Sequence, residues 1–190
     1  MPETLDLLTL LQSRNSSPKL TTPAPTTREL EEMVNAALRS PDHAWLRPTR
    51  FIVIEGEQRE ALGRLFETSL LGRNPDADEN ARAKALGSPL RAPLMVVVTV
   101  QLTEHPKVPH SEQRLSAGCS AYGLLLAAEA LGYAGIWRTG DNAFDPEVAS
   151  GLGLGADQEI VGFIYLGTRT GKSKSLPTIN PREFISHWTP

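Results

Sequence analysis

The segment Pro93–Val100 most constrains the fold of this 190-residue chain, because it is apolar almost without interruption. A strand with one face in water alternates apolar and polar side chains, whereas a continuous apolar run is typical of a strand buried on both faces. Further strands are predicted at Phe51–Ile54, Tyr133–Trp137 and Ile160–Gly167. The segment therefore indicates the central strand of a sheet that lies inside a globular protein.

The sequence around Thr26 gives the clearest helix signal. Thr26 and Glu29 form a capping-box pattern, and Pro41 ends the helix. Apolar residues follow the cap at helical spacing: Leu30, Met33, Val34, Ala37 and Leu38. Other helices are predicted over Glu3–Gln12, Gln58–Leu71, Arg82–Leu86 and Glu112–Leu131, and from Asp145-Pro146 onwards.

The order of these elements predicts an α+β fold in which helices cover a mixed sheet. The length of 190 residues suits a single domain spanning residues 1–190. The first helix is expected to bury a face of leucines. The polar, proline-containing tail Thr168–Pro190 is expected to wrap the surface of the protein or a partner subunit.

Composition excludes several classes of function. The net charge of −3, with no run of Lys and Arg, gives no footprint for nucleic acid or an anionic membrane. The longest apolar region, Leu115–Leu131, is too short and too rich in small residues for a membrane span. The single cysteine, Cys119, lies in an apolar helix and is expected to be a buried structural residue. Because no internal disulfide can form and the segment Met1–Leu20 lacks the basic start and continuous apolar core of a signal peptide, we expect a cytoplasmic location.

Three polar groups could bind a ligand. Arg14 and Ser16 fall on a turn before Pro18, where a guanidinium, a hydroxyl and free amides could bind a phosphate. A solvated turn is the alternative, and on spacing alone it is the commoner one. Arg39 and His43 flank a helix end and could donate to a heterocycle or an anion, or could be an ordinary helix-end cation and a surface histidine.

The third group is Trp137-Arg138-Thr139-Gly140, where a strand leaves the sheet. Loops at strand ends commonly bind ligands. The alternative is a core tryptophan followed by an exposed arginine, and the sequence leaves both open.

No side chain stands out as a catalytic acid, base or nucleophile. Glu104, His105 and His110 match no standard metal-site spacing, so no metal ligand is predicted. The glycine-rich stretch Gly151–Gly155 follows a helix, whereas a dinucleotide fingerprint follows a strand.

An ordered set of short motifs extends over nearly the whole chain, from about Leu7 to Thr168. The motifs are Arg14-Asn15-Ser16, Ala24-Pro25-Thr26, Arg39-Ser40-Pro41-Asp42-His43, Arg50–Gly56, Arg91-Ala92-Pro93, Lys107-Val108-Pro109, Ser116–Cys119, Gly135–Arg138 and Ile160–Thr168. In this combination the chain resembles the small bacterial FMN-dependent NAD(P)H nitroreductase family, and within it the compact branch.

The resemblance implies a nitroreductase-like α+β fold and an intertwined homodimer with one FMN in each of two interfacial sites. It implies that Arg14, Asn15 and Ser16 bind FMN from one subunit and that Arg39 and His43 reach it from the other. Trp137, Arg138 and Thr139 would close the site from the first subunit. The implied reaction carries hydride from NAD(P)H to a nitroaromatic, quinone or similar small acceptor by a ping-pong mechanism. Because the cofactor performs this chemistry, no catalytic side chain is required.

Two departures from the family pattern bear on function. Many members have Gln-Pro-Trp where this chain has Arg47-Pro48-Thr49, which changes the expected wall of the substrate pocket. Asn15 replaces the second arginine of a common Arg-Arg-Ser, which removes one positive charge beside the expected phosphate. The departure at Arg47-Pro48-Thr49 also leaves open a second function, that of a flavin-binding accessory protein without significant turnover.

Overall fold

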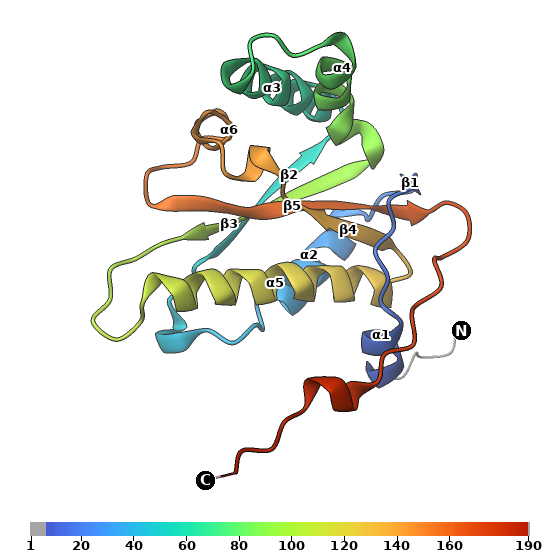
Figure 1. The fold of residues 1–190 in the computed structure, drawn as a ribbon, viewed down its shortest axis with the longest axis vertical. Coiled ribbons are helices and arrows are strands. Elements are labelled where there is room, and N and C mark those ends of the chain that lie inside the picture. Colours follow the sequence, from blue (N-terminus) through green and yellow to red (C-terminus); the bar gives the residue numbers. More distant parts are fainter. Residues whose placement is uncertain (1–6, 190) are drawn as a thin grey trace.

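The computed structural model describes residues 7–189 as a sheet with helices on both faces (Figure 1). The strands are β1 (Leu20–Thr21), β2 (Thr49–Glu55), β3 (Leu94–Gln101), β4 (Ala134–Arg138) and β5 (Gln158–Arg169). The α-helices are α1 (Leu7–Ser13), α2 (Thr27–Ala37), α3 (Gln58–Arg73), α4 (Glu79–Gly87), α5 (His110–Ala130) and α6 (Pro146–Gly151). The predicted helices and strands are therefore confirmed to within a few residues, except that the predicted start at Glu3 lies outside the described residues.

The sheet has the order β1-β5-β3-β2, and β4 also pairs with β5, on the edge opposite β3. Every strand pair in the described chain is antiparallel. The α+β class is confirmed, but the described protomer contains no parallel pair, so its sheet is not mixed. The reason is the position of β5. The crossover through α5 makes β3 and β4 parallel to each other, and β5 lies between them and runs against both.

The central strand β3 is buried along almost its whole length because each of its faces meets a different core. Leu94, Val96 and Val98 pack with α2 and α5. Met95 and Val97 pack on the opposite face, with α3 and α6. This two-sided burial is the physical reason for the uninterrupted apolar run.

Small residues in α5 let neighbouring elements approach closely. A Cβ at Gly123 would lie 3.2 Å from the Cα of Ala37 in α2, so the two helix backbones pack nearly in contact. The face of α5 that turns toward the sheet buries Ala117, Ala121, Leu124, Leu125 and Ala128.

Two expectations about burial are wrong. Cys119 is exposed, because it lies on the side of α5 that faces away from the sheet, together with Leu115 and Tyr122. In α1 only Leu10 is buried, while its other leucines are exposed, because α1 contacts little of the protomer besides α5.

The C-terminal tail runs past α1 and then away from the rest of the protomer (Figure 1). Its large apolar side chains are exposed, Phe184 by 77% and Trp188 by 86%. No helix in residues 7–189 is long and apolar enough to cross a membrane.

The capping box at the start of α2 provides a test of the fold. The Thr26 hydroxyl accepts a hydrogen bond from the Glu29 amide, and the Glu29 carboxylate accepts one from the Thr26 amide at 2.8 Å. We expect Thr26→Ala to lower the free energy of unfolding by about 1 kcal/mol. Thr27→Ala, at the exposed next position, is the matched control. Equal urea midpoints for the two variants would contradict a stabilising role of the cap.

Candidate functional site

The free edge of β4 brings two of the predicted ligand groups together. Among the described strands β4 pairs only with β5, and on its other side the Ser17 amide donates to the Gly135 carbonyl at 3.0 Å. Peptide groups alternate in direction along a strand. The peptide group of Trp137 therefore faces the same side as that of Gly135. From Gly135 to Arg138, where β4 ends, this edge extends over about 10 Å.

A cavity of about 380 Å³ opens at the Ser16 end of this edge, and we call it the cationic pocket. It is lined by Ser16, Ser17, Pro18, Lys19, Arg169, Thr170, Gly171, Lys172 and Lys174. Four of these side chains are positively charged, and none of the described residues that line the cavity is acidic. Hydroxyl groups and cations are the groups that bind phosphate and other anions.

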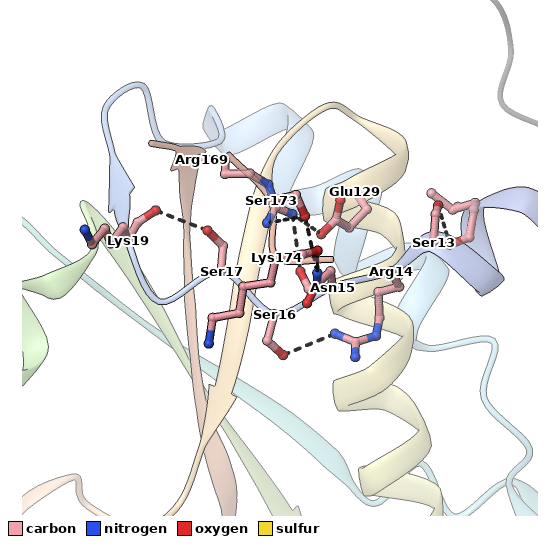
Figure 2. Close-up of polar contacts among 11 residues, drawn as sticks. Ser13, Arg14, Asn15, Ser16, Ser17, Lys19, Glu129, Arg169, Ser173 and Lys174 are labelled. Atoms are coloured by element: carbon pink, nitrogen blue, oxygen red, sulfur yellow. Dashed lines mark hydrogen bonds and ion pairs between the residues drawn. The ribbon is translucent and has the colours of Figure 1, made fainter. Parts of the chain in front are cut away.

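The segment that was predicted to bind phosphate lies against this pocket (Figure 2). Arg14 is half-buried, and its Nη1 donates to the Ser16 hydroxyl at 3.4 Å. Asn15 does not line the pocket. Its side-chain amide donates to the Lys174 carbonyl at 2.7 Å and to the Ser173 hydroxyl at 3.3 Å. Arg14 and Ser16 thus point toward each other, whereas Asn15 holds the tail.

An ion pair supports the rear of the pocket. Arg169, at the end of β5, donates through Nη2 to Glu129 Oε1 at 3.0 Å and to the Asn15 carbonyl at 3.2 Å. Burial raises the pKa of the Glu129 carboxyl above its usual value, although the charges of Arg169 and Arg14 oppose that shift. One guanidinium therefore joins α5, β5 and the N-terminal segment.

A second cavity, of about 340 Å³, opens at the other end of β4, and we call it the Arg138 pocket. It is lined by Phe66, Lys84, Ser88, Arg91, Arg138, Thr139, Gly140, Asn142, Phe163 and Tyr165. The guanidinium carbon of Arg138 lies 5.8 Å from the centre of the Tyr165 ring. Arg138 Nε is buried and has no hydrogen-bond partner in the described chain. Burial raises the pKa of the Tyr165 hydroxyl, which therefore stays neutral at neutral pH.

Trp137 and Arg138 point to opposite faces of the sheet. Trp137 packs on the α5 side against the core that contains Val96 and Leu124. Its Nε1 is buried and has no hydrogen-bond partner among residues 7–189. The interpretation of Trp137 as a core side chain is correct, but Arg138 is half-buried and lines a cavity.

Arg39 and His43 are not brought to either pocket within one protomer. His43 Nδ1 lies 2.7 Å from Glu112 Oε2 near the start of α5, and Arg39 lines a separate cavity of about 460 Å³. The Arg14 segment lies near Glu129 at the other end of the same helix. The separation of 17 positions from Glu112 to Glu129 corresponds to about 25 Å of helix.

Six cations in the two pockets were not singled out by the sequence analysis: Lys19, Lys84, Arg91, Arg169, Lys172 and Lys174. The only signal for the tail residues is the spacing of three basic residues, Arg169, Lys172 and Lys174, at the end of the last strand and just after it. In the part of the chain that the structure describes, no cluster of His, Cys, Asp and Glu could hold a metal ion.

The fold and comparisons with known proteins define the class of this protein. A model described as "Nitroreductase family" matches residues 11–168, and the chain belongs to this family, which makes it an oxidoreductase. It is 39% identical over 185 residues to the Escherichia coli (strain K12) protein named "Putative NAD(P)H nitroreductase YdjA", and the match covers 97% of this chain and all of that protein.

Solved structures show the same fold. A nitroreductase-like family protein from Bacillus cereus aligns with a TM-score of 0.83 at 22% identity, covering 98% of each chain. The FMN and NADPH-dependent nitroreductase NfnB from sphigopyxis sp. strain HMH aligns with a TM-score of 0.78 at 17% identity, covering 97% of this chain and all of that one. The nitroreductase-like fold that the sequence predicted is therefore confirmed.

Packing at Gly162 tests how the end of β4 is held. A Cβ at this position would overlap Trp137 Nε1 and would lie 3.1 Å from the Arg138 carbonyl oxygen. We expect Gly162→Ala to lower the free energy of unfolding by about 1–3 kcal/mol, because the tryptophan must move out of a close-packed core. Gly87→Ala is the control, since nothing lies within 4 Å of the Cβ it would add. A urea titration that finds both variants equally stable would refute the tight packing of Trp137.

Proposed function

We propose that this protein is an FMN-dependent oxidoreductase that transfers hydride from NAD(P)H to a nitroaromatic, quinone or similar small acceptor. The observation that carries the proposal is the pair of anion-attracting pockets at the two ends of one free strand edge. The names of the relatives support it, because the E. coli relative is named for NAD(P)H and the NfnB structure for FMN and NADPH.

The cationic pocket fits the phosphate of FMN. Ser16 offers a hydroxyl, Arg14 lies beside it, and Lys19, Arg169 and Lys172 supply charge without an acidic competitor in the lining. Guanidinium and ammonium groups form charge-assisted hydrogen bonds with phosphate oxygens. Arg14 and Ser16 would therefore hold the phosphate, as the sequence predicts.

The Arg138 pocket fits the polar edge of the flavin ring. Lys84, Arg91 and Arg138 line this pocket, and none of its lining residues is acidic. Because like charges close together repel each other, a bound group that carries negative charge would stabilise the three cations. The unpartnered Arg138 Nε offers a donor, and the outward peptide group of Trp137 offers a further polar contact. Trp137, Arg138 and Thr139 would thus contact the ring mainly through Arg138 and the backbone.

Bound FMN would supply the hydride transfer itself. The residues of the chain would bind and orient the cofactor, and Arg138 would supply positive charge beside the ring. No side chain is assigned as a catalytic acid or base.

We further propose a homodimer with FMN at the subunit interface. One protomer leaves apolar tail side chains exposed, together with Leu115 and Tyr122 on α5. Extended apolar surfaces of this kind are typical of protein interfaces. Neither Arg39 nor His43 lines the cationic pocket of its own chain, which supports their contribution from the partner. A single domain over residues 1–190 and a cytoplasmic location remain part of the proposal.

The visible absorption spectrum of the purified protein tests the function. We expect flavin absorbance that disappears when NADPH or NADH is added without oxygen, and a small acceptor should restore it. Initial-rate kinetics should give parallel double-reciprocal lines, because donor and acceptor use the same open face in turn. Stable flavin absorbance that neither donor bleaches would favour the accessory protein instead. Intersecting lines would contradict the shared face.

Mixed dimers test the division of the site between subunits. Losing a hydrogen bond to a charged group costs roughly 1.5–3 kcal/mol, so Arg14→Ala and Arg39→Ala should each weaken FMN binding by about ten- to a hundredfold. A mixed dimer of the two variants should recover one of its two sites, since both changes fall in the same site. Arg28→Ala, which removes only an exposed pair with Glu32, is the control. Mixed dimers that bind no better than either parent would contradict a site built from two subunits.

A further inference from the structure

We infer that Asn15 is a positioning residue, whose side-chain amide fastens the start of the C-terminal tail so that Lys172 and Lys174 line the phosphate site. Arg169 and Glu129 complete this arrangement, and we call the three residues the tail clasp. The inference rests on the proposed function in one respect, namely that the cationic pocket binds the FMN phosphate.

The clasp consists of hydrogen bonds that cross from one segment to another. Asn15 donates to the Lys174 carbonyl at 2.7 Å and to the Ser173 hydroxyl at 3.3 Å. The Asn15 carbonyl in turn accepts from Arg169 at 3.2 Å. Asn15 therefore bonds to the tail through its side chain and to the end of β5 through its backbone (Figure 2).

Without such contacts this part of the tail would have little to hold it. The tail residues after β5 are exposed and form no regular element until the short 3₁₀ turn Pro181–Phe184. Ordering a backbone residue costs about 1–2 kcal/mol of conformational entropy. The hydrogen bond from Asn15 to the Lys174 carbonyl offsets part of this cost at the residue whose side chain lines the pocket. Figure 2 shows the Lys174 side chain extending toward Ser16 and Ser17.

Glu129 keeps Arg169 in place from the other side. Its carboxylate accepts from Arg169 Nη2 at 3.0 Å, so the same nitrogen that contacts Asn15 is held by α5. Arg169 Nη1 lies 3.5 Å from the Ser173 hydroxyl, which leads back to the tail. The clasp thus joins α5, β5, the N-terminal segment and the tail.

The neutral amide explains the absence of a second arginine at position 15. Arg14, Lys19, Arg169, Lys172 and Lys174 already place five cations in or beside the pocket. Another cation at position 15 would add repulsion, whereas an amide can donate two hydrogen bonds without adding charge. The lost positive charge noted in the sequence is supplied by lysines from the tail.

The test compares the affinity for FMN with that for riboflavin, which lacks the phosphate. In Asn15→Ala we expect the preference for FMN over riboflavin to fall about tenfold, since two hydrogen bonds are lost, with riboflavin affinity unchanged. Asn15→Gln keeps the amide and should recover part of the preference. Glu129→Gln keeps an acceptor for Arg169 and should reduce the preference less than Glu129→Ala.

Two variants serve as controls. Glu159→Ala removes the bidentate pair with Arg114, which also joins α5 to β5 but lies at the far end of both elements. Asn74→Ala removes an exposed asparagine at the end of α3. Neither should change the preference for FMN.

Trypsin cleavage of the flavin-free protein provides a readout that does not depend on the cofactor. Cleavage after Lys172 and Lys174 should be several-fold faster in Asn15→Ala than in the wild type and the controls, because the tail is released. An unchanged cleavage rate, or equal losses of FMN and riboflavin affinity, would overturn the clasp alone. A wild-type protein that binds riboflavin as tightly as FMN would instead overturn the phosphate site itself, while faster cleavage would still support the attachment of the tail by Asn15.

Discussion

Burial of β3 on both faces is the constraint on which the other parts of the structure depend. A strand with Leu94, Val96 and Val98 on one side and Met95 and Val97 on the other must be covered by two separate layers. The helices α2 and α5 form one layer, and α3 and α6 form the other. Because β5 occupies one side of β3 and β2 the other, β4 is left at the outside of the sheet, with its peptide groups free for the N-terminal segment and for a ligand.

The charges of the candidate site follow from this arrangement. The polar groups of the cationic pocket come from the N-terminal segment, the end of β5 and the tail. Some of those in the Arg138 pocket come from the connection between α4 and β3. At the cationic pocket Glu129 compensates Arg169 from behind, whereas the side of the cavity that faces solvent carries only positive charge. At the Arg138 pocket no acidic side chain among the described lining residues balances the cations. Unbalanced charge of one sign on a concave surface attracts anions of the opposite sign.

Local patterns were sufficient to predict the elements, since capping at Thr26 and apolar periodicity act within a few residues. The two pockets were predictable only in part. Arg14, Ser16 and Arg138 come from recognisable segments, whereas Lys84, Arg91 and Lys172 reach the site through the fold. The exposure of Cys119 could not be inferred from an apolar helix, because burial depends on which side of α5 the sheet covers. The direction of the Asn15 side chain depends on a tail more than 150 residues away in the sequence.

Two ion pairs join the helix α5 to β5, one near each end of the helix. The positions of cation and anion are exchanged between the two pairs. At the start of α5 a cation, Arg114, belongs to the helix and an anion, Glu159, to the strand. At its end the anion, Glu129, belongs to the helix and the cation, Arg169, to the strand. The reversal leaves a cationic strand end beside the cationic pocket, while the helix contributes the counter-ion from behind. A helix that carried the cation at this end would put the carboxylate on β5, where it would face the pocket and repel an anion. The direction of this ion pair therefore keeps the negative charge away from the cationic pocket.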